Sequence, residues 1–214
     1  MLSLLRPYYF NINLYIAISP KEAIIIEKVC TREMMGLYWK SVGAVHTEKT
    51  VELALRKAEE YGIKSIVVAS NSGKTAEFFA GKVENVVCVT HANGFKQPGV
   101  NELASGQRER LIEKNVRILT TTHVLSGAER GISRKFGGVY PVEIIANTLK
   151  IFGQGVKVTV EIAVMALDAG LIPYGEDIIA IGGTGNGADT AVVIRPAHAA
   201  NILDTYIAEI ICKP

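Results

Sequence analysis

The chain has 214 residues, of which 49% are hydrophobic and 21% are charged, and this composition excludes a disordered protein. The 23 Lys and Arg residues nearly balance the 21 Asp and Glu residues, which argues against nucleic acid as a partner. The mean hydropathy of +0.24 is high, yet no segment reaches the roughly 18 uninterrupted apolar residues that a membrane-spanning helix needs. We therefore expect a large core, with neither nucleic acid nor a membrane as a partner.

The cysteines indicate the compartment. Cys30, Cys88 and Cys212 are odd in number, far apart and without a C-x-x-C motif. This spacing fits neither a disulfide framework nor a zinc site. We expect reduced, buried thiols in a cytoplasmic protein.

Residues 1–35 differ from the rest of the chain. Their apolar run is interrupted by Asn11 and Asn13, which disfavours a signal peptide. The segment is an ordered extension, a flexible leader or the product of a wrongly assigned start, since a methionine pair stands at 34–35. We expect an N-terminal extension over 1–35 and one domain over 36–214.

From residue 47 onwards, helical and strand patterns alternate. Apolar residues at i, i+3, i+4 and i+7 predict a helix with Thr47 as its N-cap and Gly62 as its left-handed end. Short, continuous apolar runs predict strands that are covered on both faces. In chain order, we expect helices over 48–61, 75–81, 101–114, 139–152 and 156–169, and strands over 65–69, 86–90, 116–121, 178–181 and 191–194.

This alternation predicts a three-layer α/β fold. Its sheet should be mostly parallel, with right-handed crossovers and a terminal antiparallel hairpin. The helix over 156–169 carries Lys157, Glu161 and Asp168 on one narrow stripe, and its other faces are apolar. Such a helix is either buried inside the domain, which we favour, or covered by another subunit.

Ligands of such sheets bind at the carboxyl ends of the strands, and the loop after the first buried strand is polar. It holds Ser70, Ser72, Gly73, Lys74 and Thr75. Gly73 lets the backbone approach a ligand, and the start of the next helix directs free N–H groups at it, so the loop fits a phosphate monoester. The alternative is that Ser72 only caps the helix. A P-loop is excluded, because no glycine stands five positions before Gly73.

Two histidines follow the next two strands. Thr90 and His91 end one strand, with Phe95 close behind them, and His123 follows the other strand. If they face one cavity, His91 and His123 are candidate catalytic acids or bases near neutral pH. The alternative for each is a hydrogen bond to a backbone carbonyl. A third metal ligand in register is missing, so we expect no metal.

A glycine-rich loop follows the next-to-last predicted strand. The pattern G-x-G-x-x-A over 183–188 resembles a dinucleotide-binding fingerprint, but a strand follows where that fingerprint opens a helix. We expect instead a hairpin beside the ligand, with Gly183 and Thr184 near it. Asp189 and Thr190 should be free to hydrogen-bond a sugar or the edge of a ring.

One further cluster is basic. Arg130 and Arg134 stand four residues apart, which is the spacing of neighbours on one helix face. Contact with an anion and a solvated basic face both fit this spacing.

Several of these motifs resemble a known family. The strand over 66–69, the loop S-x-S-G-x-T-A over 70–76 and the strand over 86–90 look like the carboxyl-terminal α/β domain of pyruvate kinase. A closer resemblance, over about 36–214, is to small archaeal-type proteins that are similar to this domain but lack the barrel. Its most specific part is G-A-D-T-A-V-V-I-R-P-A-H over 187–198.

The resemblance implies a fold and a class of ligand. It implies that Ser70, Ser72, Gly73 and Thr75 contact phosphate, that the protein forms homo-oligomers, and that flavin mononucleotide (FMN) or a similar nucleotide occupies the cleft. Lys74 departs from the small or uncharged residue expected at its position. Pyruvate kinase activity is not implied, because that chemistry needs a barrel of roughly 250 residues.

Three functions are therefore in view. The first is binding of a phosphorylated small molecule, FMN or a relative of it, between the polar loops. The second is an enzyme acting on a phosphorylated metabolite, or a flavin-dependent redox catalyst, with His91 or His123 as acid or base. The third is an oligomeric regulatory or structural subunit that uses the helix over 156–169 as an interface.

Overall fold

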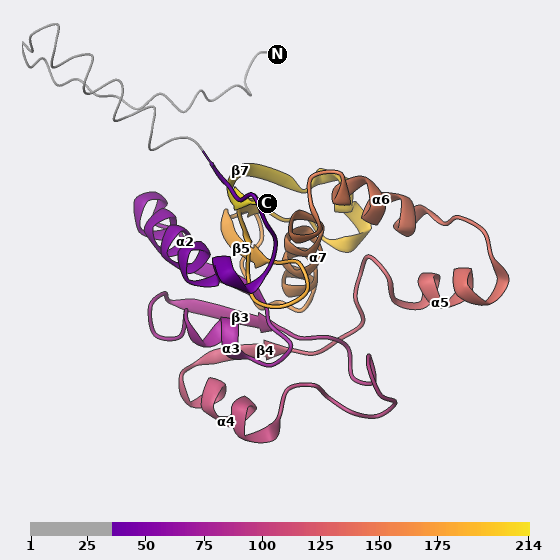
Figure 1. The fold of residues 1–214 in the computed structure, drawn as a ribbon, viewed down its shortest axis with the longest axis horizontal. Helices are drawn as coiled ribbons and strands as arrows, with labels where there is room; N and C mark the ends of the chain where they lie inside the picture. The colour runs from indigo at the N-terminus through magenta and orange to yellow at the C-terminus, as the bar shows by residue number, and fades with distance from the viewer. Residues whose placement is uncertain (1–35) are drawn as a thin grey trace, which may run out of the picture. The chain divides into compact units, whose positions relative to one another are not determined.

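The buried strands of the chain form a single sheet (Figure 1). The computed structural model describes residues 36–214, so the expectations for residues 1–35, including a leader or a later start, lie outside the described residues. The strands are β1 (Leu37–Tyr38), β2 (Ser65–Ala69), β3 (Asn85–Val89), β4 (Val116–Leu119), β5 (Ile178–Gly182), β6 (Thr190–Arg195) and β7 (Tyr206–Lys213).

The order of the strands across the sheet is β1-β7-β6-β5-β2-β3-β4. Neighbours among β2, β3, β4 and β5 are parallel, β6 is antiparallel to both β5 and β7, and β1 is parallel to β7. The predicted mostly parallel α/β sheet with an antiparallel hairpin is therefore confirmed. The hairpin joins β5 and β6, and β7 extends the sheet beyond it.

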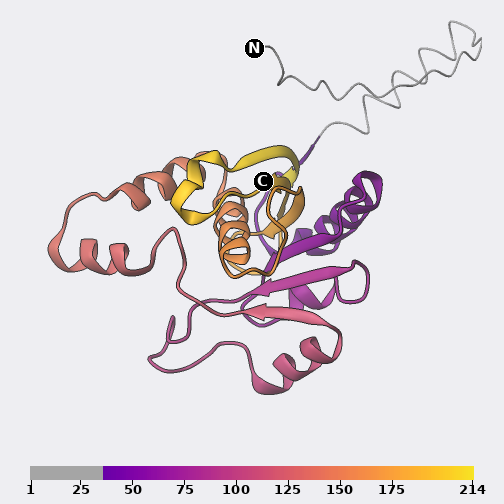
Figure 2. The ribbon, with the colours of Figure 1, turned by 180° about the vertical axis from the view of Figure 1, so that it is seen from behind.

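Helices cover both faces of this sheet (Figures 1 and 2). Along β2, Ile66 and Val68 pack with α2 and Phe79 on one face, whereas Val67 packs with α7 on the other. These two apolar layers on either side of the strands give the predicted three-layer arrangement. The helices are α2 (Thr47–Tyr61), α3 (Lys74–Glu77), α4 (Ser105–Glu113), α5 (Gly127–Phe136), α6 (Pro141–Lys150) and α7 (Gln154–Asp168), with short 3₁₀ helices η1 (Ala44–His46) and η2 (Ala199–Asp204).

The helix α7 is buried within the domain, which decides between the two alternatives left by its sequence. Residues on nearly all of its faces are buried, Lys157 and Glu161 among them. The two charges form an ion pair of 2.5 Å, and Glu161 Oε1 also accepts the backbone N–H of Leu125 at 3.0 Å. Each of the two buried charges is therefore neutralised by the other and not by water.

Several element limits differ from the predicted ones. Thr47 is the first helical residue and not the N-cap, because its Oγ1 accepts the N–H of Ala188 at 3.0 Å. Residues 101–104 are not helical, because the side chain of Asn101 accepts the N–H of Leu103 in a turn. The strands β1 and β7 and the helix α5 were not predicted as elements; β1 is only two residues long.

The described thiols agree with the sequence-based expectation. Cys88 and Cys212 are buried and free, and burial raises the pKa of Cys88 to about 12 and that of Cys212 to about 11. Neither is a reactive thiolate at neutral pH. Within residues 36–214, no helix is long and apolar enough to cross a membrane.

Candidate functional site

A cavity of about 360 Å³ lies at the carboxyl ends of the central strands. Ala69 ends β2, Val89 ends β3 and Gly183 follows β5, and all three line the cavity together with the first half of α7. Its volume is within the range of about 300–1,000 Å³ that is typical of small-molecule sites. Two wider and more open depressions, of about 840 and 670 Å³, lie toward the amino ends of the strands, where this class of sheet does not bind its ligands.

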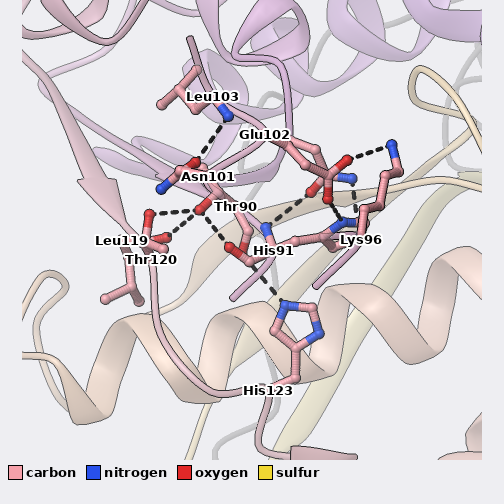
Figure 3. Close-up of polar contacts among 10 residues, drawn as sticks. Thr90, His91, Lys96, Asn101, Glu102, Leu103, Leu119, Thr120 and His123 are labelled. Atoms are coloured by element: carbon pink, nitrogen blue, oxygen red, sulfur yellow. Dashed lines mark hydrogen bonds and ion pairs between the residues drawn. The ribbon is translucent and has the colours of Figure 1, made fainter. Parts of the chain in front are cut away.

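His91 is held on one wall of this cavity by three hydrogen bonds to two neighbours, and the bond to Glu102 is drawn in Figure 3. Its Nδ1 lies 2.5 Å from Oε2 of Glu102, and its Nε2 lies 3.0 Å from Nδ2 of Asn71. The other atom of the same amide, Oδ1 of Asn71, accepts the backbone N–H of His91 at 3.0 Å. Because an amide nitrogen only donates, Nε2 of His91 is the acceptor and the proton lies on Nδ1, toward Glu102.

The partner carboxylate is kept ionised. Burial opposes the charge on Glu102, but hydrogen bonds from Lys96 and His91 outweigh it, and the pKa of Glu102 is lowered. Lys96 forms an ion pair with the second oxygen, Oε1 (Figure 3). A carboxylate that holds Nδ1–H of a histidine and leaves Nε2 basic is the usual arrangement of an acid–base pair in catalysis.

Three rings are grouped at the same wall. The ring of Phe95 stacks on His91 with centroids 3.9 Å apart, and the His123 ring is tilted 5.6 Å from His91. Nε2 of His123 donates to the carbonyl of Thr90 at 3.4 Å, so the backbone-bonded alternative describes this histidine. Burial lowers the pKa of His123 and outweighs the nearby Glu161 carboxylate and the hydrogen bond to Thr90, which both raise it, so a neutral ring is favoured at pH 7.

The opposite side of the site comes from α7 and the glycine-rich loop. Gln154 and Lys157 from α7, Arg130 from α5 and glycines 183, 185 and 187 all line the cavity. No side chain caps the start of α7, where Gly153 precedes Gln154. The first N–H groups of this 15-residue helix and the Arg130 guanidinium are the groups near the cavity that suit an anion.

The predicted phosphate loop is placed differently from expectation. Ser70 Oγ accepts the N–H of Thr75 at 3.2 Å, so Ser70, not Ser72, stabilises the start of α3, and both bonded groups are buried. Ser72 and Lys74 are exposed, and Gly73 lies against the side chains of α4. None of these five lines the cavity; of this loop, only Asn71 does.

The expectation that Asp189 and Thr190 are free to bind a ligand is wrong. Asp189 is fully buried, and its carboxylate accepts the N–H of Gly43 at 2.8 Å, the N–H of Thr184 at 3.1 Å and the hydroxyl of Thr190 at 2.7 Å. These bonds tie the glycine-rich loop to the segment before α2. Asp189 thus shapes the site without facing it, while Gly183 lines the cavity as expected.

The family of this chain is identified by comparing its sequence with a family model. A sequence model of the pyruvate kinase α/β domain matches residues 48–194. This chain belongs to the pyruvate kinase α/β-domain family. The match contains β2 to β5, all of β6 except its last residue, and every residue that lines the cavity.

Solved structures similar to this pyruvate kinase α/β-domain protein include a pyruvate kinase from Cryptosporidium parvum. It is 16% identical over 67% of this chain, with a TM-score of 0.33, and the same organism's pyruvate kinase in complex with ADP is 13% identical over 90%, with a TM-score of 0.32. This chain covers only 21% and 27% of those two chains.

Sequence reasoning missed several residues of this pyruvate kinase α/β-domain site. Glu102 lies 11 residues after His91 in a loop, and no short motif links them. Asn71 stood unremarked inside the predicted phosphate loop. Arg130 lines the cavity, which favours anion contact over a solvated face for this side chain, whereas Arg134 does not line it. Among residues 36–214, no group of three His, Cys, Asp or Glu side chains is arranged to hold a metal ion.

Proposed function

We propose that this protein binds a phosphorylated small molecule with a planar ring, FMN or a related nucleotide, in the 360 Å³ cavity. The observation that carries the proposal is that one cavity joins a wall of rings to a set of groups that suit an anion. The cavity is of the size that a ligand of this class needs.

The ring of the ligand belongs at Phe95. This side chain is 55% exposed although it stacks on His91, so one aromatic face remains for a ligand. Offset stacking of aromatic rings contributes about 0.5–1.5 kcal/mol beyond the area that it buries. Asn71 and His91 add polar groups at the same wall.

The phosphate belongs at the start of α7, beside Arg130. The uncapped first turn offers N–H groups and the positive end of the helix dipole, and the adjacent glycines let a ligand approach the backbone. The family resemblance favours a second location, the loop with Ser70, Ser72, Gly73, Lys74 and Thr75. We favour α7, because it lines the same cavity as the rings and that loop does not.

Titration of the full chain tests this proposal. FMN and riboflavin, which differ by the phosphate, are titrated by flavin fluorescence into the wild type, Arg130→Ala and the matched variant Arg134→Ala. We expect Arg130→Ala to weaken FMN binding by roughly 10- to 150-fold and riboflavin binding little, since a charge-assisted bond to phosphate contributes about 1.5–3 kcal/mol. Arg134→Ala should bind FMN as the wild type does.

Two further results decide the location and the proposal itself. Ser72→Glu places a carboxylate in the alternative phosphate loop, and we expect it to leave FMN affinity unchanged; a loss confined to this variant would move the phosphate to that loop. No flavin in the purified protein and no binding of FMN, ADP or ATP would refute the proposal.

A second candidate function is favoured by one observation, the Glu102–His91 pair. With the proton on Nδ1, the Nε2 lone pair of His91 can accept a proton from a bound phosphorylated metabolite that displaces Asn71 Nδ2 from it. The test is a panel of phosphorylated metabolites assayed with the wild type, His91→Ala, His123→Ala and Glu102→Gln. Equal turnover in all four would remove both histidines from the chemistry.

A further inference from the structure

The two helices α5 and α6 and the residues that follow them form an arm, residues 127–152, that leaves many apolar side chains in water. In Figures 1 and 2, α5 lies at the outer edge of the domain, away from the sheet. Not one residue of α5 is buried. The exposed apolar side chains of the arm are Ile132, Phe136, Val139, Ile144, Ile151 and Phe152, with exposures between 46% and 80%.

These side chains are ordered along the helices. Ile132 and Phe136 are four residues apart on α5, so they share one face of it. Ile144 on α6 and Ile151, which directly follows the last helical residue with helical backbone angles, are seven apart and also share a face. The face of α6 that packs on the domain is a different one, because it presents the buried Ala146. Each helix therefore keeps an apolar stripe with no partner among the described residues.

A helix of this length does not persist in water by itself. Isolated helices shorter than about 12–15 residues are marginal even in favourable sequences. None of the ten residues of α5 is fully buried. Two hydrogen bonds tie it to α6, from the Ser133 hydroxyl to Glu143 and from the Val142 N–H to Glu129. The apolar stripes of the arm are therefore open to a second surface outside the described residues.

The charges of the arm identify that surface. The helix α5 has Glu129 in its first turn and Arg134 in its last, and α6 repeats the pattern with Glu143 and Lys150. When a two-fold axis perpendicular to such a helix relates two copies, the copies run antiparallel and each acidic end meets a basic end. In a two-fold dimer the same surface of both copies meets, so that surface must be complementary to itself. An uncharged apolar stripe with one acidic and one basic end meets this requirement.

We propose that the arm 127–152 packs against the same arm of a second copy of this chain, with the paired helices antiparallel. The interface differs from the buried helix α7 that the sequence offered for self-association. The arm also carries Arg130 to the cavity, so dimerisation holds this side chain in place, a consequence that rests on the proposed ligand site.

Sedimentation of the full chain at low and high micromolar concentration tests the dimer. We expect the wild type to have twice the monomer mass of 23.1 kDa, and Phe136→Asp/Ile151→Asp to have the monomer mass. The matched control is Leu203→Asp, which changes an 82% exposed side chain on η2, outside the arm, and should remain dimeric. Circular dichroism checks that each variant is folded.

A charge reversal tests the antiparallel arrangement in a variant that keeps the apolar stripes and the bond between Ser133 and Glu143. Lys150→Glu should weaken the dimer at low salt and less so at high salt, because each basic end meets an acidic end across the interface. A monomeric wild type, a Phe136→Asp/Ile151→Asp variant that stays dimeric, or a Lys150→Glu variant that dimerises as tightly as the wild type at low salt would each overturn the proposal. The mass is measured without FMN, so the two proposals can fail separately. A monomer that binds FMN contradicts only the proposed dimer. A dimer that binds no flavin contradicts only the proposed ligand site.

Discussion

The ion pair between Lys157 and Glu161 gives the sharpest prediction of stability. Its side chains are only 10% and 5% exposed, and Glu161 also accepts the N–H of Leu125. Glu161→Leu leaves an ammonium group and a backbone N–H buried without their acceptor. Removal of one member of a buried pair costs about 3–5 kcal/mol, and we expect the free energy of unfolding to fall by about that amount.

The double variant separates the charge from the packing. Lys157→Met/Glu161→Leu removes both charges and leaves only the N–H of Leu125 unsatisfied, which costs about 1–3 kcal/mol. The double variant should therefore be more stable than Glu161→Leu alone, by about 2 kcal/mol.

The exposed pair of Lys49 and Glu52 is the control. These side chains are 50% and 61% exposed, so Glu52→Gln should cost less than about 1 kcal/mol. Urea unfolding, followed by circular dichroism, measures all of these variants. The reasoning is refuted if Glu161→Leu costs no more than Glu52→Gln, or if the double variant is the least stable of the set.

Three further predictions concern other parts of the domain. A Cβ on Gly155 would lie 2.0 Å from Thr190 Oγ1, so Gly155→Ala should lower the free energy of unfolding in urea by at least about 1–3 kcal/mol. The control is Gly106→Ala in α4, where the Cβ meets open space, and it should raise the free energy of unfolding by up to about 1 kcal/mol. The pKa of His123 is lower in the folded state, so the unfolded chain binds the proton first and the free energy of unfolding should fall as the pH drops below about 6.5. Unfolding curves at pH 7.5 and 5.5 measure this loss. In His123→Gln this part of the pH dependence should vanish. Asp189→Ala leaves three donors without an acceptor, two of them buried, and should cost several kcal/mol, about 1–3 for each buried donor. A loss below about 1 kcal/mol in the same assay would show that water replaces the carboxylate.

The elements that the sequence predicted correctly are those with a strong local pattern. The run Ser65–Ala69 is continuously apolar because the strand β2 is covered on both faces, and Gly62 ends α2 with a φ of 64°. The strand β7 was missed because a residue such as Glu209, which forms an ion pair with Lys57, interrupts its apolar pattern. Its pairing with β6 is a long-range contact that no local pattern records.

Residue types in the candidate site were predicted better than their partners. His91, His123, Phe95 and Gly183 line the cavity, because parallel strands bring their carboxyl ends to one edge of the sheet. The phosphate loop and Asp189 show the limit of this reasoning, since a polar side chain after a strand can bond inside the protein as well as to a ligand.

The sequence by itself determined the class of fold, the sites of the buried strands and the edge of the sheet where ligands belong, because these follow from hydrophobic periodicity and from the rules of strand connection. Only the tertiary structure decided which polar groups meet. It paired His91 with Glu102, buried Lys157 against Glu161, and turned the carboxylate of Asp189 inward. Two of these contacts join distant or irregular segments, whereas Lys157 and Glu161 are neighbours on one helix face and only their burial comes from the packing of α7. The energy of all three depends on burial, which the order of residues does not state.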